Sequence, residues 1–251
     1  MDLDRHVVTH TQRQIGEHRQ GEACFQVMDA VSRPCAGIAV WAEQESHAFV
    51  FGCVPPDLSG VVETDRQRCA DRLAEAFNHL RPAGAPTDLG VTLVDVPERV
   101  HLGQFARELD RLAPAGLPLE VQVRGRSIGV ESLPERDAAD RVAALYTLCF
   151  AHPAVGAIIW SGFWDGEPGV DGGGLLRTDF APKPAFRFLH KLIASVWHSR
   201  ASGVTDPKGR FCFRGFFGDY RVGVRTAEVT STERLSHVRG AGPTVVQVRQ
   251  D

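Results

Sequence analysis

Apolar and polar residues alternate with different periods along the chain, and the change of period divides it into parts. Between about residues 47 and 200, short apolar runs alternate with stretches whose apolar residues recur every three or four positions. This pattern predicts strands that alternate with amphipathic helices. Such an order is typical of parallel strands joined by right-handed crossovers.

Four strand–helix pairs are expected in this middle part. The strand candidates are apolar runs bounded by Gly, Pro or polar residues, at 47–56, 89–96, 117–125 and 155–164. The helix candidates follow them at 64–80, 102–116, 135–152 and 182–200. In the first helix, the apolar residues that share one face are Cys69, Leu73, Phe77 and Leu80. In the second, they are Phe105, Leu109 and Leu112.

Both ends of the chain are predicted to form β-structure instead. After a short polar helix at 5–20, residues 23–44 predict a β-hairpin or meander around a turn at 32–34. Alternation resumes at 205–226, and a last strand is expected at 244–250. We therefore expect three segments: a helix with strands over 1–46, an α/β part over 47–200, and further strands over 201–251.

Composition excludes some partners and leaves others open. The 251 residues are 43% hydrophobic, which is ample for a core, and the net charge of −3 does not point to nucleic acid. The N-terminal stretch is polar and no segment predicts a membrane span, so a cytoplasmic protein is expected. No His pattern or Gly-rich loop has the spacing of a metal or phosphate site, so no metal or cofactor is predicted.

The six cysteines are scattered and contain no CxxC pair, which argues against a zinc ribbon. Reduced thiols are the simplest expectation in a cytoplasmic protein. A bridge from Cys24 or Cys35 to Cys212 stays open, provided that both segments share a sheet.

The stretch "AIIWSGFWDGEPG" (157–169) carries the most conspicuous candidate chemistry. Trp164 and Asp165 lie where a buried strand ends, so they are candidates for a ligand-binding or catalytic lip. The competing interpretation makes Trp164 a packing aromatic and Asp165 a loop cap. Trp160, inside the strand, is expected in the core.

Two further strand ends carry polar candidates. Asp95 closes the strand at 89–96 and is a candidate acid, base or ligand contact, or else an ordinary polar residue before a helix. Arg124 and Arg126 follow the strand at 117–125 and could bind an anion or a carboxylate. The alternative for this pair is a solvated loop.

Five stretches in order resemble glycoside hydrolase family 10, the retaining endo-β-1,4-xylanases, in its bacterial form with accessory β-sandwich strands. They are "GEACFQVMDAVSRPCAGIAVWAEQESHAFVFG" (21–52), "ADRLAEAFNHL" (70–80), "RELDRLAPAGLPLEV" (107–121), "FAHPAVGAIIWSGFWDG" (150–166) with "PKPAFRFLHKLI" (182–193), and "TDPKGRFCFRGFFGDYRVGV" (205–224). The resemblance implies a (β/α)8 barrel with its site at the carboxyl ends of the strands.

The departures from that family are large. Only about ten residues separate the first helix from the stretch that resembles the sixth barrel strand, so we expect strands two to five to be missing together with the acid/base Glu. A retaining glycosidase needs two carboxylates about 5–5.5 Å apart. The family's nucleophile position falls on Val123 in "LPLEVQV", and Glu120 lies three residues back on the opposite face of the strand. Ser161 and Gly169 stand where the family has sugar-stacking Trp residues.

The strands that remain would be one, six, seven and eight, which are neighbours in the closed barrel in the order 6-7-8-1. We therefore expect an α/β fold with a partial barrel of about four βα units, half of a TIM barrel, and a small β-sandwich built from both termini. The two open edges, at 47–53 and 89–95, must be paired or covered. A homodimer that joins these edges would rebuild eight strands, whereas covering by the sandwich or by loops is the alternative.

The functional prediction follows from these losses. We expect a degenerate, xylanase-like protein without the glycosidase carboxylate pair, which binds a carbohydrate or small molecule or serves as a scaffold. The alternative is a repurposed enzyme, such as an isomerase, cyclase or hydrolase of secondary metabolism. Its residual pocket would use Asp95, Arg124, Trp164 and Asp165.

Overall fold

The computed structural model describes residues 2–84, 90–98, 100–225, 230–240 and 244–247. Contacts divide the chain into two units. The α/β unit comprises residues 1–18 and 49–196, and the β unit comprises residues 19–48 and 197–251. Residues 49–196 of the α/β unit therefore lie between the two segments of the β unit in the sequence, whereas residues 1–18 precede both segments.

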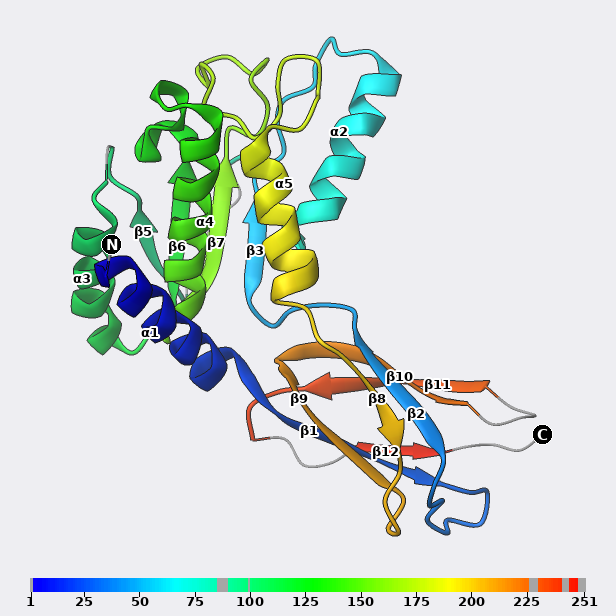
Figure 1. The fold of residues 1–251 in the computed structure, drawn as a ribbon. Helices are drawn as coiled ribbons and strands as arrows, with labels where there is room; N and C mark the ends of the chain where they lie inside the picture. The colour runs from blue at the N-terminus through cyan, green and yellow to red at the C-terminus, as the bar shows by residue number, and fades with distance from the viewer. Residues whose placement is uncertain (1, 85–89, 99, 226–229, 241–243, 248–251) are drawn as a thin grey trace. The chain divides into compact units, whose positions relative to one another are not determined.

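The α/β unit contains one parallel sheet and the α-helices of the described residues (Figure 1). The strands are β3 (Val50–Cys53), β4 (His79–Leu80), β5 (Thr92–Asp95), β6 (Leu119–Arg124) and β7 (Val155–Ser161). The helices are α1 (Asp2–Arg19), α2 (Glu63–Ala76), α3 (Leu102–Leu112), α4 (Glu135–Ala151) and α5 (Pro184–Lys191), with a π-turn over Leu192–Val196 after α5. Every described helix is too short or too polar to cross a bilayer.

The strand order in this sheet is β4-β3-β7-β6-β5, and all four pairings are parallel. The order of the four predicted strands is thus the expected one. The fifth strand, β4, was not predicted. It pairs with β3, so the expectation of an open edge at 47–53 is wrong.

The predicted helix at 64–80 is too long because its last residues join the sheet. Helix α2 ends at Ala76, and Phe77 is already extended. The Asn78 side chain accepts a hydrogen bond from the Phe51 amide and donates one to the Phe49 carbonyl oxygen. These bonds hold the chain beside β3. Leu80 therefore lies in β4 rather than on the buried face of the helix, and it is 48% exposed.

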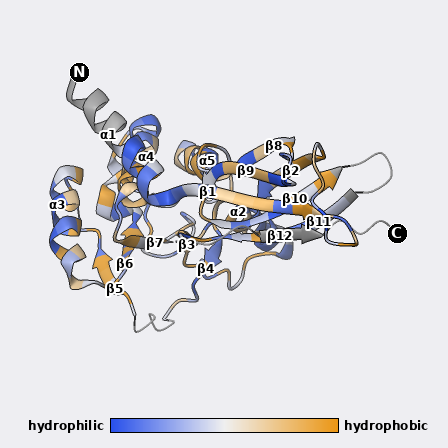
Figure 2. Cartoon of the chain, turned by 90° about the horizontal axis from the view of Figure 1, so that it is seen from below, coloured by the Kyte–Doolittle hydropathy of each residue, from blue (hydrophilic) through white to orange (hydrophobic). Residues whose placement is uncertain are grey.

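The two faces of the sheet differ in what covers them. The aromatic rings of α4 pack on one face, with Tyr146 next to Trp160 of β7 and Phe150 next to Phe51 of β3. Figure 1 shows α4 and α5 in front of these strands, and Figure 2 shows that α3 contains both hydrophilic and hydrophobic residues. Since side chains alternate along a strand, Val121 and Val123 share the helix-covered face.

The β unit consists of strands from both ends of the chain. They are β1 (Gln20–Met28), β2 (Ala39–Gln44), β8 (Arg200–Val204), β9 (Arg210–Phe216), β10 (Gly218–Arg225), β11 (Thr230–His237) and β12 (Thr244–Gln247). One sheet has the order β12-β1-β9 and the other β11-β10-β2-β8. Side chains from both sheets form one core, around Phe25, Val40 and Tyr220.

Two predictions fail in this unit. Residues 23–44 do not form a hairpin or meander, because β1 and β2 belong to different sheets. Their connection turns at Asp29, whose carboxylate accepts hydrogen bonds from the amides of Val31 and Arg33. The predicted helix at 182–200 is also too long, since its last residue, Arg200, begins β8 and pairs with Glu43 of β2.

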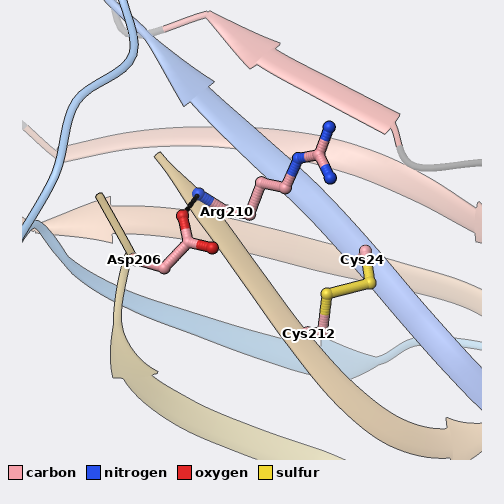
Figure 3. Close-up of a disulfide and its surroundings, with 4 residues drawn as sticks. All are labelled: Cys24, Asp206, Arg210 and Cys212. Carbon is pink, nitrogen blue, oxygen red and sulfur yellow. Dashed lines mark hydrogen bonds between the residues drawn. A yellow bond between two sulfur atoms is a disulfide. The ribbon is translucent and has the colours of Figure 1, made fainter. Parts of the chain in front are cut away.

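A disulfide joins the two halves of the β unit (Figure 3). Cys24 of β1 and Cys212 of β9 are direct partners in the antiparallel pair, and their Cα atoms are 4.1 Å apart. Of the alternatives left open, the structure therefore has Cys24 rather than Cys35 as the partner of Cys212. The expectation that all thiols are reduced is wrong for this pair.

Candidate functional site

The carboxyl ends of the parallel strands meet at one edge of the α/β unit, where ligands usually bind in such folds. The last residues of the four predicted strands are Cys53, Asp95, Arg124 and Ser161. Two cavities lie beside this edge, and both are built from residues of the α/β unit.

The first cavity has a volume of about 200 Å³ and lies between the segments that follow β6 and β7. It is called the strand-end cavity below. Arg124 and Ser161 are partners in the parallel register, so their side chains emerge next to each other. Arg126 also lines the cavity and forms an ion pair with Asp171, at 3.5 Å between Nη1 and Oδ2.

Glycines allow the two segments to approach closely at this cavity. A Cβ on Gly125 would lie 1.8 Å from the Gly173 carbonyl oxygen, which no side chain tolerates. Gly162 has a φ of +73°, a left-handed conformation that glycine adopts without strain. These glycines therefore shape the cavity.

Glu167 contributes the carboxylate of the strand-end cavity. Burial raises the pKa of Glu167, and the nearby Asp57 charge raises it further, against a backbone hydrogen bond from Asp57 that lowers it. Its Oε2 atom is buried and has no hydrogen-bond partner among the described residues. Sequence reasoning missed this residue because "GEPG" reads as an ordinary polar turn.

The second cavity, of about 220 Å³, lies beside the first turns of α4 and α5. Its charged groups are largely engaged with one another. Lys183 Nζ is 2.6 Å from Asp165 Oδ2, and both side chains are 14% exposed. Arg177 and Glu135 form another ion pair, at 2.5 Å.

Asp165 and Trp164 are held by contacts within the loop that follows β7. Asp165 Oδ1 accepts a hydrogen bond from the Gly174 amide at 2.8 Å, in addition to its ion pair with Lys183. The Trp164 ring stacks on Phe180, with centroids 4.6 Å apart, and its Nε1 donates to the Thr178 carbonyl oxygen. These contacts agree with a packing aromatic and a loop cap. A direct ligand contact by either residue stays a prediction.

Asp95 lies away from both cavities. It is exposed at the end of the edge strand β5, where its register partner is Gln122 of β6. Neither cavity includes it among its lining residues. The structure therefore brings Arg124 and Glu167 to one cavity and Asp165 to another, whereas Asp95 joins neither.

On β6, the residue at the position that resembles the family's nucleophile is not a carboxylate, and the one glutamate of the strand is engaged in an ion pair. Val123 is fully buried on the helix-covered face. Glu120 faces the other side, where both of its oxygens accept hydrogen bonds from the Arg81 guanidinium. Arg81, which lies between the predicted helix at 64–80 and the predicted strand at 89–96, is the partner that sequence reasoning missed.

One cluster in the described part of the chain has metal-ligand geometry, and it consists of Glu22, Cys24 and Cys212. The two sulfur atoms are bonded to each other, so this cluster is a disulfide with a neighbouring carboxylate. It offers no thiolate to a metal in this state.

The chain was compared with protein-family models, with curated proteins and with solved structures. No protein-family model matches the chain. About two thirds of its length is nevertheless similar in sequence to endo-xylanases.

The particular relatives are much longer proteins. The chain is 31% identical over 167 residues to endo-1,4-beta-xylanase 1 of Arabidopsis thaliana, a match that covers 64% of this chain and 16% of that protein. It is 32% identical over 162 residues to anti-sigma-I factor RsgI6 of Acetivibrio thermocellus, covering 62% of this chain and 20% of that protein. The chain thus spans a fifth or less of the length of these curated relatives.

Solved xylanase structures also match in part. The native xylanase 10B of Thermotoga maritima aligns with a TM-score of 0.33 and 20% identity, over 59% of this chain and 47% of that one.

Proposed function

We propose that this chain is a degenerate, truncated relative of the family 10 xylanases that binds a carbohydrate, or serves as a scaffold, without hydrolysing glycosidic bonds. The observation that carries the proposal is Val123, a fully buried apolar residue in the position that resembles the nucleophile. The nearest carboxylate on the same strand, Glu120, is bound by Arg81. A retaining mechanism needs two carboxylates on either side of the scissile bond.

The sheet order supports a partial barrel as the ancestral fold. The observed order is β5-β6-β7-β3. In the proposed partial barrel, these strands would correspond to the sixth, seventh, eighth and first strands of the family, and the short β4 would correspond to the start of the second. The strands of the β unit would be the remains of the accessory sandwich.

Incubation of the purified chain with xylan and with an aryl β-xyloside tests the proposal. We expect no release of reducing sugar or aryl alcohol, and retarded migration in a gel that contains xylan. Hydrolysis that Glu167→Gln or Asp165→Asn abolishes, while the variant Glu98→Gln, at an exposed residue outside both cavities, retains it, would refute a non-hydrolytic role.

A homodimer through strand edges belongs to this proposal. Among the described strands, β5 pairs with β6 alone, and its Leu93 is 45% exposed. Pairing of β5 with β4 of a second copy would satisfy both edges. Light scattering after size exclusion should then give about 55 kDa, twice the 27.4 kDa of the chain, and Leu93→Glu should reduce it to the single-chain mass. A single-chain mass for the unaltered protein at micromolar concentration would contradict the dimer.

The proposed cytoplasmic location has an argument against it. Disulfides persist mainly in oxidising compartments, and Cys24 and Cys212 form one. Blocking free thiols during cell lysis and then counting the remaining disulfides decides the matter. A cytoplasmic protein should keep this pair reduced.

The alternative function, a repurposed enzyme of secondary metabolism, has one specific observation in its favour. Glu167 combines a raised pKa with a place in a cavity at the strand ends, as expected of a general acid or base. Turnover of a small molecule that Glu167→Gln abolishes, without loss of binding, would favour this enzyme over a binding protein.

A further inference from the structure

The disulfide of the β unit lies on the outward face of the β12-β1-β9 sheet. On β1, Ala23 and Phe25 are buried in the core of the unit, so Cys24 between them points to the other side. Cys212 is exposed on β9, directly opposite Cys24 (Figure 3). A reductant or a metal ion can therefore reach this pair without opening the core.

Glu22 adds a carboxylate to the same face. It lies two residues before Cys24 on β1 and is exposed. Since side chains alternate along a strand, Glu22 and Cys24 point to the same side of the sheet. One carboxylate oxygen of Glu22 and the two sulfur atoms lie within 4.8 Å of one another. The three ligand atoms are thus close enough for one ion to contact all of them.

Reduction would convert this cluster from a disulfide into a set of metal ligands. A thiolate of a dithiol reductant attacks one sulfur atom, the bond between the cysteines breaks, and the second thiol of the reductant displaces the first. The reductant leaves as a disulfide, and Cys24 and Cys212 each gain one electron and one proton. Two thiols and a carboxylate then occupy one small area of the sheet.

The geometry and the type of these ligands suit zinc. Zinc binds thiolates at about 2.3 Å in a tetrahedral arrangement, so two thiolates on one ion lie about 3.8 Å apart. Opposed residues of an antiparallel pair have Cβ atoms about 4.5–5.5 Å apart, which lets the freed sulfur atoms reach that spacing by side-chain rotation. Thiolate ligands favour zinc over magnesium or calcium.

The charge around the cluster also suits a zinc ion. Two thiolates and the Glu22 carboxylate carry three negative charges, of which the ion neutralises two. Arg210 and Arg214 lie two residues on either side of Cys212 and share its exposed face. Their positive charges would offset the remaining negative charge.

The other thiols are poorly suited to compete for the metal. Cys53, Cys69 and Cys149 are buried. Burial raises the pKa of Cys53 well above its ordinary value and the pKa of Cys69 to about 11, so both stay protonated at neutral pH. Metal ligands must be deprotonated, so the exposed pair is favoured.

We propose that reduction of the Cys24–Cys212 disulfide creates a zinc site, with both thiolates and the Glu22 carboxylate as ligands and water in the fourth position. Binding of one zinc ion displaces the two thiol protons. Strands β1 and β9 are then cross-linked in either state, by the disulfide when oxidised and by zinc when reduced. This site lies in the β unit and does not depend on the proposed carbohydrate-binding function.

Zinc titration of the two redox states tests the inference. The full chain is reduced with dithiothreitol, freed of it by gel filtration under nitrogen, and titrated with zinc against a chromophoric chelator. Reduced protein should bind one zinc ion per chain, at least a hundredfold more tightly than oxidised protein. Equal affinity in the two states would overturn the proposal.

Cobalt(II) in place of zinc identifies the sulfur ligands. Reduced protein should show thiolate-to-cobalt charge-transfer absorption in the near ultraviolet, with the intensity of two thiolates. The double variant Cys24→Ser with Cys212→Ser should lose this absorption, and Cys35→Ser should keep all of it. Absorption that persists in the double variant would place the metal on other thiols and overturn the assignment.

The variant Glu22→Gln tests the third ligand while both thiols stay in place. It should weaken zinc binding at least tenfold and retain the charge-transfer absorption, because it removes an oxygen ligand alone. The matched control is Glu233→Gln, which removes an exposed carboxylate on β11 of the other sheet and should leave zinc affinity within twofold. Equal zinc affinity in the two variants would exclude Glu22 as a ligand and overturn the proposed site.

Discussion

Arg81 and Glu120 form an ion pair in which both carboxylate oxygens accept hydrogen bonds from the guanidinium. Arg81 follows β4, Glu120 lies on β6, and the strands β3 and β7 lie between them in the sheet. Their side chains are 16% and 4% exposed. The pair therefore ties together four strands on the face that α4 leaves uncovered.

Removing one partner of this pair should be strongly destabilising. Glu120→Gln leaves the Arg81 charge largely buried without its counter-charge, and we expect a loss of about 3–5 kcal/mol in the free energy of unfolding. Urea unfolding followed by circular dichroism at 222 nm measures it, because helices α2–α5 all belong to the α/β unit.

The exposed pair of Arg72 and Glu75 on α2 provides the control. Glu75→Gln should change the unfolding free energy by less than about 1 kcal/mol, since exposed pairs contribute little. The double variant Arg81→Met with Glu120→Leu should recover most of the stability lost in Glu120→Gln. A Glu120→Gln variant as stable as the unaltered chain would contradict this role.

The Cys24–Cys212 disulfide predicts a definite thiol count. Denatured, unreduced protein should expose four thiols, and reduced protein all six. The double variant Cys24→Ser with Cys212→Ser should lower the stability of the β unit by about 2–5 kcal/mol, because the disulfide restricts the unfolded chain. Cys35→Ser, which keeps the disulfide, should have a much smaller effect. Six reactive thiols without reductant would show that the bridge does not form.

Asp165 is expected to act mainly on stability. Asp165→Asn leaves the Lys183 ammonium largely buried without its counter-charge, and should cost about 2–4 kcal/mol in urea unfolding. Asp171→Asn is the matched control. Its ion pair with Arg126 is exposed, and Asn tolerates the left-handed backbone at φ +47°. If Asp165→Asn instead kept full stability and lost ligand binding, Asp165 would be a ligand contact.

Glu167 should give stability a distinct pH dependence. Its pKa in the folded state lies above the ordinary value of 4.5, chiefly because of burial. Between 4.5 and the folded pKa, the unfolded chain has lost this proton and the folded chain still holds it, so stability falls as the pH rises. Glu167→Gln removes that fall.

The variant should therefore gain stability relative to the unaltered protein as the pH rises above 4.5. Thermal unfolding from pH 4 to pH 8 measures this difference. A constant difference for Glu167→Gln would mean that its pKa is not raised by folding.

Several elements could be predicted from local pattern alone. The alternation of apolar runs and amphipathic stretches determined the α/β order, and Phe105 and Leu109 are buried on α3 as their spacing requires. Trp160 is in the core for the same reason. Prediction from the local pattern failed where a segment forms hydrogen bonds with residues that are distant in the sequence. Asn78 bonds to Phe51 and thereby ends α2 before Leu80, and β1 pairs with β9 instead of forming a hairpin with β2.

The sequence by itself determined the class of fold, the strand-end location of Arg124 and the absence of an acidic residue at position 123. Those properties depend on the spacing of apolar residues and on the residue type at each position, and both can be read from a short stretch of the chain. The tertiary structure alone decided that Arg81 meets Glu120, that Cys24 meets Cys212, and that Arg124 and Glu167 line one cavity. These residues are far apart in the chain, and their contacts depend on strand order and register, which many distant side chains set together.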